Sequence, residues 1–191
     1  MRIAGGELRG RRLTVPEGLE IRPTSEQVRE AIFSMVNSYF ELQGAVAYDL
    51  YAGTGALGFE AISRGAKLCT FVEKNRTAAN QILSYAGQFG VLTKVRVETT
   101  SVEKSIPSLA EKRTGNEQAL ILADPPYAES GGDSFLVQLL NGPLLRPGDL
   151  FVFEEATPRT PGGNDKRRNS NVEPEDVIKG ESKLARIVRD R

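Results

Sequence analysis

Two short motifs contain the residues of this chain that could do chemistry. Asp124-Pro125-Pro126-Tyr127 follows an apolar stretch over 119–123, and Gly53-Thr54-Gly55 follows another over 45–50. A carboxylate next to a proline carbonyl presents two acceptors, which can draw the N–H groups of a nucleobase amine out of the ring plane and free its lone pair. An aromatic ring at Tyr127 offers a flat face for a splayed-out base. The alternative is an ordinary turn that ends a strand.

The glycine motif is typical of the turn between a strand and a helix. The run from Gly53 to Gly58 matches the G-x-G-x-x-G pattern of dinucleotide-binding folds, and Glu73 ends the next predicted strand, over 67–72. Glycine lets the backbone turn sharply and lets a ligand approach the main chain. An acidic residue at the second strand tip can accept hydrogen bonds from a ribose diol. The unit therefore predicts a nucleoside cofactor, and NAD or a flavin is one candidate.

Asp49, four residues before Gly53, favours a different cofactor. A carboxylate at the end of the first strand suits S-adenosylmethionine, which carries an amino group and a sulfonium and has no pyrophosphate. Alternatively, Asp49 only caps a turn. The stretch from Asp49 to Gly55 resembles motif I of class I methyltransferases. This resemblance implies that S-adenosyl-L-methionine is held by Asp49, Ala52, Gly53, Thr54, Gly55, Glu73, Lys74, Ser101 and Val102.

Residues 1 to 23 are predicted to form an N-terminal extension, because strand-like pieces alternate there with glycines in the manner of a hairpin. Within residues 1 to 13, four arginines face Glu7 as the single opposing charge. Such a cluster can neutralise phosphates of a nucleic acid, or it can be a solvated face. The four are Arg2, Arg9, Arg11 and Arg12.

A helix is predicted to begin after Thr24, with Thr24 as N-cap and Gln27 completing a capping box. The turn before it could pack over the mouth of the cofactor site and bring Arg22 to a substrate. Apolar residues recur at helical spacing along one face of this helix. They are Val28, Ala31, Ile32, Met35, Val36 and Tyr39.

The stretches from Gly6 to Leu13 and from Arg22 to Phe33 resemble the N-terminal signature of the bacterial 16S rRNA guanine-N2 methyltransferase family. The resemblance implies methylation of a guanine N2 amine in 16S rRNA or in an assembling small subunit, by direct displacement without a covalent enzyme intermediate. Asp124, Pro125, Pro126 and Tyr127 would then be the catalytic residues. Residues in contact with RNA would be Arg2, Arg9, Arg11, Arg12, Arg22 and Thr24.

Ser101 departs from the pattern of this family, whose members usually carry an acidic residue there to contact the adenine amine. A serine hydroxyl accepts that hydrogen bond more weakly than a carboxylate. If the change abolishes cofactor binding, the chain is a non-catalytic RNA-binding module of methyltransferase fold.

Composition excludes several other classes of protein. The 25 basic and 25 acidic residues balance, so a nucleic acid must be bound by local patches. The absence of histidine excludes a Ser-His-Asp triad and a histidine metal site. A single cysteine, Cys69, excludes an internal disulfide. With no membrane-spanning run and no signal peptide, we expect a cytoplasmic protein without a metal, most simply a monomer.

Alternating helices and strands are predicted along the rest of the chain. We expect an α/β fold with a Rossmann-like, doubly wound, mostly parallel seven-stranded sheet, in one domain over 1–191 whose core is 24–191. The remaining elements are helices over 56–64, 75–89, 101–112 and 134–140, strands over 91–97 and 149–155, a polar loop over 157–171, and an antiparallel strand pair over 172–179 and 182–188.

Other enzymes could use the same tetrapeptide. A DNA amino-methyltransferase usually carries a separate target-recognition domain, for which 191 residues leave no room. A methyltransferase acting on a protein glutamine remains possible. An NAD-dependent oxidoreductase would need a substrate domain and would give Asp124 no role.

Overall fold

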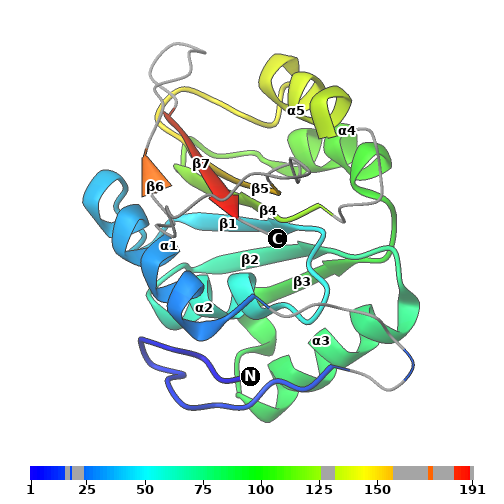
Figure 1. Cartoon of the computed structure of the whole chain (residues 1–191). Helices are drawn as coiled ribbons and strands as arrows, with labels where there is room; N and C mark the ends of the chain where they lie inside the picture. The colour runs from blue at the N-terminus through cyan, green and yellow to red at the C-terminus, as the bar shows by residue number, and fades with distance from the viewer. Residues whose placement is uncertain (16–17, 19–23, 126–131, 157–171, 174–182, 190–191) are drawn as a thin grey trace, which may run out of the picture.

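Strands and helices alternate along the chain in the computed structural model, which describes residues 1–15, 18, 24–125, 132–156, 172–173 and 183–189 (Figure 1). The strands are β1 (Val46–Leu50), β2 (Leu68–Val72), β3 (Val95–Glu98), β4 (Ala119–Ala123), β5 (Leu150–Ala156), β6 (Val172–Glu173) and β7 (Lys183–Arg189). The helices are α1 (Glu26–Tyr39), α2 (Ala56–Ser63), α3 (Arg76–Gln88), α4 (Val102–Lys112) and α5 (Gly132–Asn141), with a 3-10 turn η1 (Leu92–Lys94). In the part of the chain that is described, no helix is both long and apolar enough to cross a membrane.

The strands form one sheet in the order β3-β2-β1-β4-β5-β7-β6. β3, β2, β1, β4 and β5 run parallel, β7 runs parallel to β5, and β6 pairs antiparallel with β7. The strand order reverses between β1 and β4, and open α/β sheets bind ligands at such a switch point. The predicted Rossmann-like, mostly parallel fold is confirmed. The loop expected over 157–171 and most of the strand expected over 172–179 lie outside the described residues.

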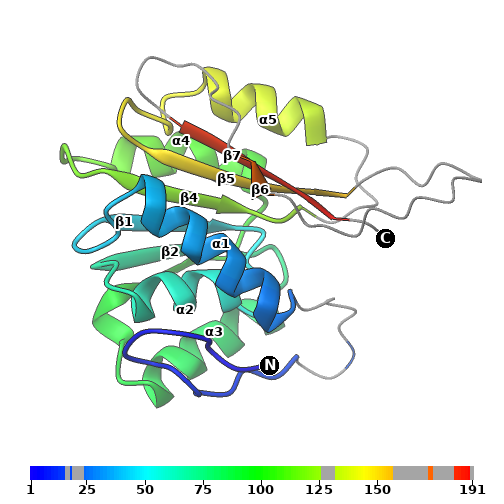
Figure 2. The same ribbon diagram turned by 60° about the vertical axis from the view of Figure 1, so that its left-hand side comes forward.

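Helices cover both faces of the sheet (Figure 2). α1, α2 and α3 pack on one face together with the N-terminal segment, and α4 and α5 pack on the other. Alternation along β1 divides its side chains between the faces, because Ala47 belongs to the first core and Tyr48 and Leu50 to the second. β4 is buried at all its positions, as a central parallel strand should be.

α2 packs very closely on β2 at Gly58. A Cβ added there would lie 2.3 Å from Cε1 of Phe71 and 2.8 Å from Sγ of Cys69. Both of these side chains are fully buried. The third glycine of the motif therefore permits close helix–strand packing. Gly53 and Gly55 have positive φ angles of 55° and 77°, which glycine adopts without strain.

The start of α1 differs from the prediction. Ser25 is the N-cap, and its hydroxyl accepts a hydrogen bond from the N–H of Val28 at 3.3 Å. The predicted N-cap at Thr24 is wrong, and Gln27 completes no capping box with it. The Thr24 hydroxyl donates instead to the side chain of Asp124, and a charged acceptor makes the stronger hydrogen bond.

Two further sequence predictions are wrong. Tyr39 is 44% exposed, because α1 ends there and the extended Phe40 fills the core in its place. The first half of the strand predicted over 91–97 is the turn η1, in which the N–H of Lys94 donates to the carbonyl of Val91 at 2.9 Å. β3 therefore begins only at Val95.

The N-terminal segment folds back on itself and packs beside α2 and α3 (Figure 1). The N–H of Ile3 donates to the carbonyl of Arg11, and the N–H of Leu13 donates to the carbonyl of Met1, both at 3.0 Å. Ile3, Leu8 and Leu13 are buried. We call residues 1–13 the N-terminal hairpin.

Glu60 and Ser63 of α2 fasten the N-terminal hairpin to the core. The two carboxylate oxygens of Glu60 accept the N–H groups of Ala4 at 2.9 Å and Gly5 at 2.8 Å. The hydroxyl of Ser63 accepts the N–H of Leu8 at 2.8 Å and donates to the carbonyl of Gly5 at 2.5 Å. Glu60 was missed by the sequence analysis, although a lone carboxylate in an apolar helix signals a buried polar partner.

Gly6→Ala is expected to lower the free energy of unfolding more than Gly10→Ala. Both glycines have positive φ, 75° and 83°, so alanine at either position should cost ~1–2 kcal/mol. A Cβ at Gly6 would also lie 1.9 Å from the carbonyl oxygen of Ser63, whereas at Gly10 it meets nothing within 4 Å. This overlap should add ~1–3 kcal/mol. Urea unfolding measures both losses, and equal losses would contradict the close docking of the hairpin.

Candidate active site

The carboxyl edge of the sheet brings the two sequence motifs together. Leu50, at the end of β1, lies opposite Val72 of β2 and Ala123 of β4. The residues that follow these three strand ends therefore meet at one edge. They include the glycine turn, Glu73 and Asp124.

Glu73 ties the glycine turn to the start of α3. One carboxylate oxygen accepts the N–H of Gly53 at 2.8 Å, and the other accepts the N–H of Asn75 at 2.7 Å. A carboxylate oxygen has two acceptor sites, so each can still accept from a ribose hydroxyl. Glu73 is partly buried and faces the turn that a cofactor would approach.

Asp49 is buried beneath the glycine turn, and its carboxylate accepts the N–H of Gly58 at 2.8 Å. Burial raises the pKa of Asp49 well above its ordinary value, the bond from Gly58 opposes that shift, and the nearby charges of Asp124 and Glu73 raise the pKa further. Asp49 thus supports the backbone of α2, and the charges of Glu73 and Asp124 favour a positively charged ligand at this edge.

Asp49→Asn is expected to stabilise the protein increasingly as the pH rises. Because the folded-state pKa is raised, this group stabilises the fold below its ordinary pKa, and that contribution is lost as the pH rises through the elevated pKa. Asparagine stays neutral and can still accept from Gly58. Urea unfolding across a pH series measures the difference between variant and wild type. A difference that does not change with pH would contradict the buried, perturbed carboxylate.

Thr24 contacts the carboxylate of Asp124. Its hydroxyl donates to Oδ2 of Asp124 at 3.3 Å, and Thr24 is 7% exposed. Thr24 therefore lies beside Asp124 at the carboxyl edge of the sheet. Pro125 is half-buried beside Asp124. Arg22, Pro126 and Tyr127 lie outside the described residues.

Glu103 is a polar neighbour of Ser101 that the sequence analysis missed. It accepts a hydrogen bond from the hydroxyl of Tyr51 at 3.0 Å. Burial alone would raise the pKa of Glu103, but bonds from its own backbone N–H, Ser101 and Tyr51 and the charge of Lys74 outweigh burial and lower it. Tyr51 has φ of 64°, an uncommon backbone conformation that collects at functional sites. In the sequence, the signal for Glu103 is that it is an acidic residue in the first turn of α4.

The remaining predicted cofactor residues flank these groups. Ala52, Thr54 and Val102 are buried, and Lys74 is exposed. The four hairpin arginines Arg2, Arg9, Arg11 and Arg12 are all exposed, and the guanidinium of Arg11 lies 5.9 Å from the ring centre of Phe89. Among the described residues, no three or more histidine, cysteine or acidic side chains form a group that could hold a metal.

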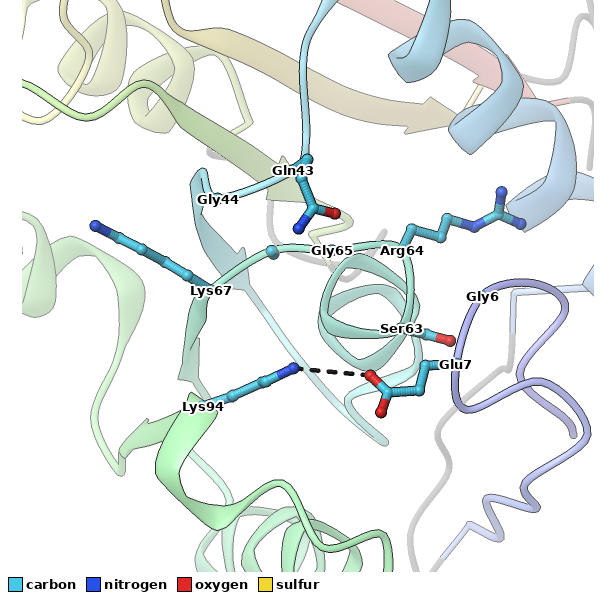
Figure 3. A pocket seen from close by; sticks show the side chains of 10 residues that line it. Gly6, Glu7, Gln43, Gly44, Ser63, Arg64, Gly65, Lys67 and Lys94 are labelled. Carbon is cyan, nitrogen blue, oxygen red and sulfur yellow. Dashed lines mark ion pairs between the residues drawn. The ribbon is translucent and has the colours of Figure 1, made fainter.

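A separate cavity of about 520 Å³ opens at the opposite, amino edge of the sheet (Figure 3). Its two lysines already have carboxylate partners, because Lys67 lies 2.7 Å from Glu117 and Lys94 lies 3.8 Å from Glu7. It shares no residue with the carboxyl edge. The cavity is lined by Gly6, Glu7, Gln43, Gly44, Ser63, Arg64, Gly65, Ala66, Lys67 and Lys94.

Comparison with known proteins identifies the family. The family model described as Conserved hypothetical protein 95 matches residues 1–170. The chain belongs to this family. YlbH of Bacillus subtilis is 36% identical over 154 residues, covering 81% of this chain and 82% of YlbH. Ribosomal RNA small subunit methyltransferase D of Haemophilus influenzae is 31% identical over 156 residues, covering 81% of this chain and 78% of its own.

A solved structure agrees with the family assignment. The protein yhhF of Escherichia coli matches with a TM-score of 0.62 and 28% identity, covering 77% of this chain and 75% of its own. The resemblance inferred from the glycine turn and the N-terminal signature is confirmed. This member of the Conserved hypothetical protein 95 family has the fold of a methyltransferase, which favours the methyltransferase interpretation of its glycine motif over the dinucleotide one.

Proposed function

We propose that the protein transfers the methyl group of S-adenosylmethionine to the N2 amine of a guanine in 16S rRNA. The observation that supports this best is the position of Asp124-Pro125 at the end of β4, directly beside the glycine turn that follows β1. Relatives that match most of the chain are named ribosomal RNA small subunit methyltransferase D. Their name provides the substrate class, and the geometry provides the acceptors for an amine.

The negative charges at the carboxyl edge of the sheet complement the positive groups of S-adenosylmethionine. The negative charges of Glu73 and Asp124, which also raise the pKa of Asp49, favour a ligand with a sulfonium and an amino group over an anionic dinucleotide. Glu73 would accept the ribose hydroxyls. Ser101 would contact the adenine, with Glu103 supplying the nearby charge that serine lacks. The other residues proposed to line the cofactor are Ala52, Gly53, Thr54, Gly55, Lys74 and Val102.

The acceptor residues prepare the amine for reaction. S-adenosylmethionine supplies a methyl group made electrophilic by a sulfonium. The carboxylate of Asp124 would accept one amine N–H and the carbonyl of Pro125 the other, which localises the nitrogen lone pair. Asp124 or water would then take the proton released from the methylated nitrogen. Pro126 lacks an N–H that could compete for these acceptors, and Tyr127 would stack on the flipped guanine.

RNA would be held by the N-terminal hairpin. Since the whole chain carries no net charge, a local patch must neutralise the phosphates. We assign this role to Arg2, Arg9, Arg11, Arg12 and Arg22. We further propose that the seven strands form the complete methyltransferase sheet of a single domain, with 1–23 as its extension and 24–191 as its core. The protein would act as a cytoplasmic monomer on 16S rRNA or on an assembling small subunit.

Mass spectrometry of rRNA nucleosides tests this function. Purified protein and S-adenosylmethionine are incubated with 16S rRNA and with partly assembled small subunits lacking the modification. We expect N2-methylguanosine to form in one of these substrates and in neither without protein. DNA and total protein serve as parallel substrates. Methylation confined to DNA or to protein glutamine would contradict the proposal, as would the absence of any methylated product.

A further inference from the structure

A buried arginine links the N-terminal hairpin to the candidate active site. The side chain of Arg29, on α1, has no exposed surface, and its Nε lies 3.9 Å from the equally buried carboxylate of Glu60. Burial lowers the pKa of Arg29, and the Glu60 charge opposes that shift. Burying a charge is costly, so such a residue implies specific contacts that the fold or the function needs.

Two carbonyls from distant parts of the chain bind this guanidinium. Nη1 of Arg29 donates to the carbonyl of Thr24 at 2.5 Å. Nη2 donates to the carbonyl of Arg2, in the N-terminal hairpin. The hydroxyl of Thr24 in turn donates to Asp124. A continuous chain of hydrogen bonds therefore runs from the hairpin, through Arg29 and Thr24, to the proposed amine acceptor.

The guanidinium of Arg29 can hold two carbonyls in fixed positions because its shape is rigid. Its N–H groups form a planar fork with fixed directions, so the carbonyls of Arg2 and Thr24 are held at a fixed separation. Glu60 completes the arrangement, because it balances the charge of Arg29 and also accepts the hairpin N–H groups of Ala4 and Gly5. The hairpin and Thr24 thus share one rigid support.

We propose that Arg29 is a positioning residue for methyl transfer. It holds the N-terminal hairpin at a fixed position relative to the Thr24–Asp124 pair. This inference rests on the proposed function. RNA held by the hairpin then presents its target base at a fixed place relative to the acceptor carboxylate. Small misplacements of a reacting group have large effects on rate, so a rigid link between the hairpin and Asp124 should speed methyl transfer.

Arg29→Lys tests the rigid link. Lysine keeps a positive charge near Glu60, but its ammonium cannot reach both carbonyls with the geometry of the fork. At saturating RNA, we expect the single-turnover rate to fall about 10- to 100-fold. RNA affinity should also fall, and the affinity for S-adenosylhomocysteine should stay at the wild-type value. Arg64→Lys is the matched control, because Arg64 binds the same Glu60 at 2.9 Å and is expected to keep the wild-type rate.

Thr24→Val tests the last step of the link separately. Valine has nearly the same shape, and its carbonyl can still bind Arg29, so only the bond to Asp124 is lost. We expect a rate about 10-fold lower, with RNA affinity unchanged, and recovery of the rate in Thr24→Ser. Because both residues act through Asp124, the double variant should be little slower than the slower single variant.

The outcomes separate the two proposals. Wild-type rates in folded Arg29→Lys and in Thr24→Val, or rate losses that multiply in the double variant, would overturn the positioning role while leaving the proposed function intact. If Arg29→Lys does not fold, Thr24→Val decides, and a wild-type rate in that variant overturns the role. Failure of the wild-type protein to methylate rRNA would overturn the function and the positioning role together.

Discussion

Asp124→Asn is expected to slow the methyl-transfer step ~10²–10³-fold, the usual effect of removing one positioned polar contact at a reacting group. Asparagine keeps the shape of the side chain but is a weaker acceptor than a carboxylate, so its pull on the guanine amine falls. The cofactor residues stay in place. The affinity for S-adenosylhomocysteine, measured by calorimetry, should therefore stay close to wild type while the single-turnover rate falls.

Glu98→Gln is the control for Asp124→Asn. Glu98 also ends a parallel strand of the same sheet, but its carboxylate forms an ion pair with Lys112 at 2.7 Å. Neutralising it should leave the rate unchanged. If Asp124→Asn and Asp124→Ala both methylate rRNA as fast as wild type, activation of the amine by this carboxylate is ruled out.

Arg113→Met is expected to lower the free energy of unfolding by ~3–5 kcal/mol, because it leaves a buried charge uncompensated. The two Nη atoms of Arg113 bind the two carboxylate oxygens of Asp149 at 2.5 Å and 2.6 Å. The side chains are 4% and 0% exposed. Asp149 also accepts the N–H groups of Ala119 and Arg146, so this pair joins the ends of α4, β4 and β5.

Lys67→Met is the matched control, since it breaks an ion pair of similar length with Glu117 at the same edge of the sheet. The side chains of that pair are 44% and 43% exposed, so solvent screens the pair and its loss should leave the free energy of unfolding almost unchanged. Urea unfolding at neutral pH compares the variants. Similar losses in both would show that burial of the Arg113–Asp149 pair contributes nothing to stability.

The sequence predicted the core of the fold because short-range patterns carried enough information. Short apolar runs bounded by turn residues favoured buried strands, and the glycine turn marked the boundary between β1 and α2. Long-range pairing was harder to predict. No short-range pattern places β1 between β2 and β4. Likewise, Leu92 and Thr93 lie between Val91 and Val95, so the turn at Leu92–Lys94 resembles part of a strand in its composition.

The candidate site was predicted where chemistry and local sequence coincide, as at Asp49, Glu73 and Asp124. It was not predicted where a contact joins distant segments. Thr24 and Ser25 are equally good N-caps by residue type, and the Asp124 carboxylate, 100 positions away, decides between them. Arg29 was not singled out, because nothing nearby in the sequence reveals the carbonyls of Thr24 and Arg2 or the carboxylate of Glu60.

The docking of the N-terminal hairpin on α2 also sets an order of events during synthesis. The bonds from Ala4 and Gly5 to Glu60 span 56 and 55 positions of sequence. The hairpin is made first, yet its binding site on α2 leaves the ribosome only after β1 and most of α2 have been translated. Contacts between distant segments also form late, because a long loop must close first. The arginine-bearing surface is therefore assembled only once the glycine turn exists, so a nascent chain cannot present the proposed RNA contacts before the proposed cofactor-binding segment.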